Sequence, residues 1–96
     1  MYFDLIGNLY AYAIDRYKPP KLRWEKRKFE IRCYEIYTYE KLIALCYDNP
    51  FRNPKDILED QQLEIEFDII RTKNNPKRQQ EFIAARNVIN SLLNVI

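Results

Sequence analysis

The stretch "DILEDQQLEIEFDII", residues 56–70, decides between a helical fold and a mixed one. Its second half alternates apolar and acidic residues, which is typical of a half-buried strand. However, no residue between 54 and 73 favours a tight turn, and Glu, Asp and Gln are uncommon in strands. At helical spacing the same segment shows two apolar stripes, so we predict a helix that packs between two neighbours. The stripes consist of Leu58, Ile65 and Ile69, and of Leu63, Phe67 and Ile70.

Prolines divide the first half of the chain into two further helical segments. Residues 2–17 place apolar side chains three and four positions apart, and Pro19-Pro20 ends this helix because neither residue has a backbone N–H. Residues 35–47 show the same periodicity and end at Asn49-Pro50.

Asparagine–proline pairs also mark two helix starts. Asn53 suits the N-cap and Pro54 the first position of the helix in the quoted stretch, and Asn75-Pro76 repeats this signal. Residues 77–95 are then the clearest helix, with apolar residues at seven-residue spacing. This stripe predicts docking on the core or, alternatively, a helix interface with a partner or a second copy. The interface would contain Phe82, Ile89 and Leu92.

We therefore predict a mainly α fold, a compact bundle of about four helices in which residues 1–96 form one small domain. The alternative is an α+β fold with a short antiparallel pair near 28–35 and 62–71. The first of these segments contains "KFEIRCY", residues 28–34, which also alternates.

Charge is distributed very unevenly along the chain. The basic segment, residues 16–32, holds eight Lys and Arg against two acids, whereas residues 56–68 hold six acids and no base. On a helix, Asp60, Glu64 and Asp68 stack at i, i+4 and i+8, and we call these three residues the acidic ridge. The two segments either pair inside the fold or bind a partner. The candidate phosphate- or partner-binding residues of the basic segment are Lys21, Arg23, Lys26, Arg27, Lys28 and Arg32.

Catalytic equipment is scarce, so we do not expect an enzyme. The chain has no His, a single Ser (Ser91) without a nucleophile elbow, and a single Gly (Gly7), which excludes a glycine-rich phosphate loop. Cys33 and Cys46, thirteen residues apart and without His, form no zinc-binding set. We expect no metal, no cofactor and reduced thiols.

The sequence is therefore interpreted as a small non-catalytic protein that binds another protein and regulates or inhibits it. Residue types with AT-rich codons are abundant, which suggests an AT-rich genome, such as that of a low-GC bacterium or one of its phages or mobile elements, as the source. An inhibitor of a nucleic-acid-handling complex, such as an anti-CRISPR, would fit. The alternatives are a nucleic-acid-binding accessory protein that uses residues 18–32 and a small structural homodimer. The N-terminus does not resemble a secretory signal, so we expect a cytoplasmic protein without membrane contact.

Overall fold

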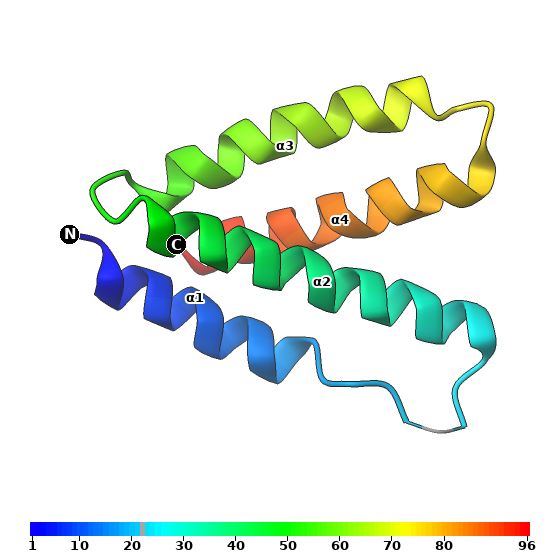
Figure 1. Ribbon diagram of the computed structural model, residues 1–96, viewed down its shortest axis with the longest axis horizontal. Helices are drawn as coiled ribbons and strands as arrows, with labels where there is room; N and C mark the ends of the chain where they lie inside the picture. The colour runs from blue at the N-terminus through cyan, green and yellow to red at the C-terminus, as the bar shows by residue number, and fades with distance from the viewer. Residues whose placement is uncertain (22) are drawn as a thin grey trace.

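Four α-helices follow one another along the chain, and no β-strand occurs in residues 1–21 and 23–96, which the computed structural model describes. They are α1 (Phe3–Arg16), α2 (Lys26–Asp48), α3 (Pro54–Arg71) and α4 (Pro76–Val95). Consecutive helices run in opposite directions (Figure 1). The predicted mainly α bundle of four helices is confirmed, and the alternative with strands near 28–35 and 62–71 is wrong, because both segments are helical.

The stretch that looked like a strand lies within α3. The side chain of Asn53 caps this helix by accepting a hydrogen bond from the backbone N–H of Lys55, and Pro54 occupies the first turn. Asp56 adds an acid in the same turn, where the helix dipole favours negative charge. These signals start a helix, and the local alternation of apolar and acidic residues does not overcome them.

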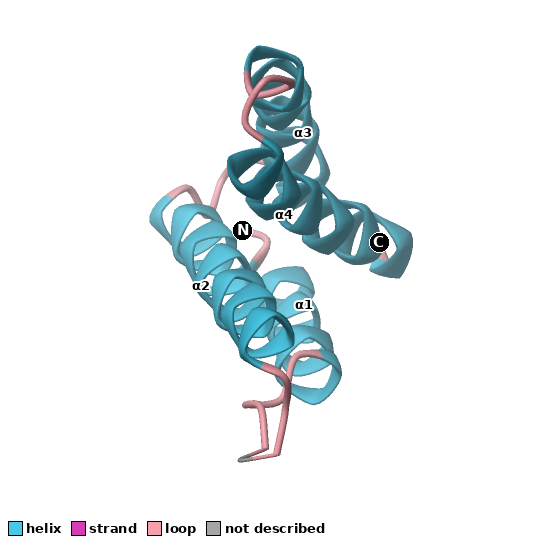
Figure 2. Ribbon diagram, turned by 90° about the vertical axis from the view of Figure 1, so that its right-hand side faces the viewer, coloured by secondary structure: helices cyan, strands magenta, loops and turns pink. Residues whose placement is uncertain are grey.

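Only one of the two apolar stripes of α3 is packed. Leu58 is fully buried and Ile65 packs against the core, but Leu63, Phe67 and Ile70 are 61%, 61% and 67% exposed. The prediction that α3 packs between two neighbours is therefore wrong for the second stripe. The reason is the position of α3 at one edge of the bundle, where it lies beside α4 and leaves its other side open (Figures 1 and 2). We call Leu63, Phe67 and Ile70 the apolar strip.

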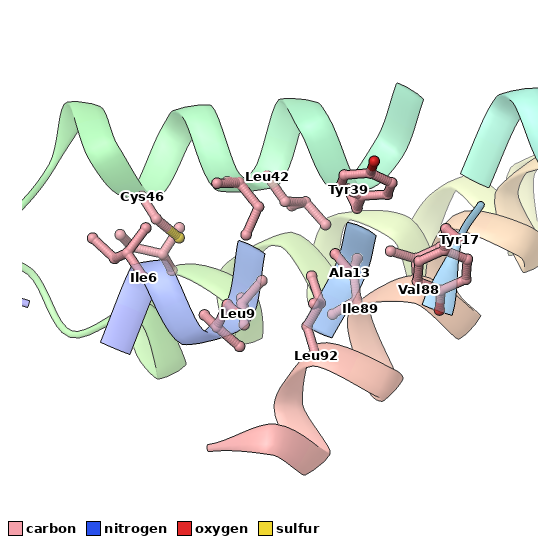
Figure 3. Packing of buried hydrophobic residues seen from close by; sticks show 13 residues of the cluster. Ile6, Leu9, Ala13, Tyr17, Tyr39, Leu42, Cys46, Val88, Ile89 and Leu92 are labelled. Carbon is pink, nitrogen blue, oxygen red and sulfur yellow. The ribbon is translucent and has the colours of Figure 1, made fainter. Parts of the chain in front are cut away.

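All four helices contribute to one hydrophobic core (Figure 3). The rings of Tyr17 and Tyr39 stack at 5.8 Å between their centroids and close one end of it. The last helix supplies Ile89 and Leu92, which are 1% and 0% exposed. Other fully buried side chains of the core are Ile6, Leu9, Cys46, Leu58 and Val88.

Candidate interaction surfaces

The apolar strip forms a single row along the outer face of α3. Its three side chains are spaced i, i+4 and i+7, so they lie one above another on a helix with about 3.6 residues per turn. Exposed apolar residues are common one at a time, whereas these three large side chains lie in one row and are each more than 60% exposed. This spacing is the one by which an amphipathic helix anchors in the groove of another protein.

Carboxylates border the strip on both sides. By helical spacing, Asp60 and Glu64 lie on one side of it, and Glu59 and Glu66 lie on the other. A shallow groove of about 560 Å³ between α3 and α4 runs along the strip at Leu63 and is lined by Glu59 and Glu66. The outer face of α3 is therefore apolar along its middle and acidic along both borders.

Some of these carboxylates have a nearby cation. Asp60 pairs with Arg52, while Glu59 and Glu66 lie 3.9 Å from Lys55 and 3.8 Å from Arg86, respectively. These are exposed pairs, which stabilise a fold only weakly. Glu64 forms no ion pair within the described part of the chain.

The acidic ridge does not form one uniform surface. Asp60 is exposed on the outer side of α3, whereas Asp68 is 21% exposed and pairs with Arg71. Glu64 and Asp68 also line a cleft of about 160 Å³ that α2, α3 and α4 enclose. The wall of this cleft that α2 supplies contains Tyr34, Tyr37 and Lys41. Burial raises the pKa of Tyr34 above its ordinary value.

In the basic segment, Arg32 has a structural role. Its guanidinium lies 3.2 Å from Glu35 and donates hydrogen bonds to the backbone carbonyls of Arg16 and Lys18. It also lies over the ring of Trp24 at 5.3 Å. Burial raises the pKa of Glu35, although the guanidinium of Arg32 opposes this shift. Arg32 thus holds the connection between α1 and α2 against α2.

Arg27 is also used inside the fold. Its guanidinium donates to the side-chain oxygen of Gln80 at 2.9 Å and to the backbone carbonyl of Lys77 at 3.0 Å. It pairs with Glu30 at 3.0 Å. These contacts tie the start of α2 to the start of α4, so two of the six predicted basic residues are already occupied.

The other four predicted basic residues point into solvent. None of them forms an ion pair with any of residues 1–21 and 23–96, while position 22 of the basic segment lies outside the described residues. The first turn of α2 contains cations and no acid, unlike the first turns of α1 and α3. Cations at this end of a helix oppose its dipole, so an anion at this surface would stabilise it. The four basic residues that point into solvent are Lys21, Arg23, Lys26 and Lys28.

An open groove of about 590 Å³ lies beside these cations. Ile31 and Ile83 provide apolar surface from α2 and α4, and Trp24 lines the groove from the preceding connection. Polar groups come from Gln80 and Asn87 on α4. The sequence analysis missed the contribution of α4, because Gln80 and Asn87 lie 48 and 55 positions beyond Arg32, the last residue of the basic segment.

The acidic and basic segments do not neutralise each other in this fold. No ion pair joins the described residues of 16–32 to residues 56–68. Two views at right angles place α3 at one edge of the molecule and the connection between α1 and α2 at the opposite edge (Figures 1 and 2). Within the described residues, the charge of each segment is therefore not neutralised by the other segment.

The helix interface predicted on α4 is divided between the core and the surface. Ile89 and Leu92 are buried, so a partner could not contact them in this fold. Phe82 is half-buried at the cleft between α2, α3 and α4, with the guanidinium of Arg78 over its ring at 4.9 Å. By contrast, the three residues of the apolar strip on α3 are each more than 60% exposed.

Comparisons of this chain with family models, with curated proteins and with solved structures found no match. In the part of the chain that the structure describes, no helix has both the length and the apolar character that a membrane span requires. Functional interpretation therefore depends on the surfaces themselves.

Proposed function

We propose that this protein is a non-catalytic binding protein whose α3 docks into an apolar groove of another protein, and that the rim of this groove carries Lys and Arg. The observation that carries the proposal is the apolar strip, three large side chains that are each more than 60% exposed and that lie between two borders of carboxylates. An apolar groove matches the strip, and basic rims match its borders.

The strip can supply much of the affinity. Burying a large apolar side chain completely contributes about 1.5–3 kcal/mol. Because about three fifths of each strip residue is still exposed, docking would add roughly 1–2 kcal/mol per side chain. Three such contributions are comparable with the energy that a few anchor residues supply in measured interfaces.

The carboxylate borders determine which partner fits. Complementary charges raise the rate of association and reject grooves with acidic rims. Glu64 has the largest part in this because it forms no ion pair with the described residues, so no such pair has to break when a partner's cation binds. A rim of Lys and Arg is also what a phosphate-binding surface offers, so α3 would compete with nucleic acid for such a surface and inhibit the partner.

The test is capture from a lysate of the native host, with and without nuclease. The intact protein is compared with a strip variant, Leu63→Gln, Phe67→Gln and Ile70→Gln. A control variant replaces three apolar residues on α1 that are 43–45% exposed, Phe3, Tyr10 and Ile14, by Gln in the same way.

We expect a protein that the intact chain and the α1 variant both capture, that remains after nuclease and that the strip variant loses. Glu64→Lys should weaken the same capture, because it places a cation against a basic rim. Capture that is equal for the intact protein and the strip variant would show that the partner binds elsewhere.

A further inference from the structure

We infer that the groove between α2 and α4 binds single-stranded nucleic acid, with one base in the groove and the flanking phosphates on the exposed cations. This site is lined by α2, α4 and the connection between α1 and α2, contains no residue of α3 and does not depend on the proposed function of α3. It combines three features that suit a single strand: uncompensated positive charge, an aromatic side chain and an apolar recess with amide groups.

The charge at this site is suited to phosphates. Four exposed cations surround the start of α2, whereas the nearby acids Glu30 and Glu35 already pair with Arg27 and Arg32. Glu25 is then the one acid of the described groove lining without an ion pair, so the local balance is clearly positive. Lys28 lines the groove itself and would contact a phosphate next to a bound base.

The recess is suited to a base and not to a duplex. Its volume of about 590 Å³ is in the range of small-ligand sites, and Trp24, Ile31 and Ile83 offer the apolar and aromatic surface on which a base packs. Asn87 is exposed at the groove, and its amide can donate to and accept from a base edge. In a duplex the bases are stacked and paired, so only an unpaired strand can place a base here.

The test uses the fluorescence of Trp24, the single tryptophan of the chain, to detect binding. An unlabelled oligothymidylate of about 20 nucleotides is titrated into the intact protein, and quenching of tryptophan fluorescence is measured. If four cations contact phosphates, affinity should fall about 50-fold between roughly 50 and 200 mM salt, since the slope for single strands is about 0.7 per contact.

Matched variants separate this site from general attraction between charges. Lys26→Ala with Lys28→Ala leaves two cations, so the same change of salt should reduce affinity only about 7-fold. The control, Lys41→Ala with Lys73→Ala, removes the same charge from exposed lysines elsewhere and should keep the steeper dependence. Asn87→Leu should weaken binding without changing the salt dependence, because it removes a base contact and no charge.

Three results would overturn the inference. The first is no quenching with about 100 µM oligonucleotide at the lowest salt, because even non-specific binding of nucleic acid is usually detected in that range. The second is equal binding by the two lysine variants. The third is an affinity for a duplex of the same length, or for polyglutamate, that equals the affinity for the oligothymidylate. This would show that a charged surface binds anions without the groove. Circular dichroism of every variant shows whether a loss of binding reflects unfolding.

Discussion

If the outer face of α3 is a binding surface, then removing Phe67, its largest apolar side chain, should hardly affect the free energy of unfolding. Phe67 is 61% exposed, so only about two fifths of the burial energy of a Phe, roughly 1 kcal/mol, supports the folded state. Alanine recovers a few tenths of a kcal/mol because it is the better helix former. Phe67→Ala should therefore lower the free energy of unfolding by less than about 1 kcal/mol.

Leu58 on the same helix is the matched control. It is 0% exposed, so Leu58→Ala removes buried methyl groups and leaves a cavity, which costs about 2–5 kcal/mol. For a domain of this size, 1 kcal/mol corresponds to a shift of roughly 4–8 °C in the melting temperature. The two variants should thus differ by about 1 kcal/mol or more in the free energy of unfolding, which corresponds to about 5 °C in the melting temperature.

The assay is urea unfolding followed by far-UV circular dichroism, with stability taken from the midpoint and the slope. Measurements at two protein concentrations detect any contribution from self-association. If Phe67→Ala cost as much as Leu58→Ala at both concentrations, the strip would be packed inside the fold, and the reasoning would fail. A cost that appears only at high concentration would instead place a second copy on the strip.

Three further results are expected. Gly7→Ala should raise the free energy of unfolding by about 0.5–1 kcal/mol in thermal melts, because this glycine is within α1, its φ is not positive and an added Cβ meets nothing within 4 Å. A less stable variant would reveal a close neighbour. Native protein at about pH 8 should be alkylated at Cys33 and not at Cys46, since burial raises the pKa of Cys46 to about 11. Mass spectrometry that shows modification of both cysteines would contradict this expectation. Changing the acidic ridge to Asn, Gln and Asn should leave the melting temperature within a few degrees of that of the intact protein, because its ion pairs are exposed or local. A much lower melting temperature would mean that the ridge balances cations inside the fold.

Helix positions were predictable from sequence because their signals are local. Asn53-Pro54 and Asn75-Pro76 fix two helix starts through caps and proline geometry, and both caps form in the structure. The strand-like alternation in 63–69 was the competing local signal, and the absence of a turn nearby correctly decided against it.

Which side of a helix is covered was not predictable in the same way. The spacing of Leu58 and of Phe67 shows only that they lie on different sides of α3, and both look equally apolar. The answer depends on the position of α3 at the edge of the bundle, which tertiary packing determines.

The same limit applies to the basic segment. Arg27 appeared to be as free as Lys26 in the sequence, but its guanidinium binds Gln80, 53 residues away, and the carbonyl of Lys77. Long-range contacts of this kind separate structural cations from those that remain available. They also bring α4 to the groove beside Trp24, which no local pattern indicates.

The most direct test of the docking surface proposed on α3 is site-specific photocrosslinking in cells of the source organism. A photoreactive phenylalanine derivative replaces Phe67 in one protein and Phe51 in another; Phe51 is the control because it is 81% exposed and lies outside α3. The proposal predicts a discrete crosslink to one protein from position 67, insensitive to nuclease and reduced by Glu64→Lys, and no such crosslink from position 51. The same partner crosslinked from position 51 but not from position 67 would contradict it.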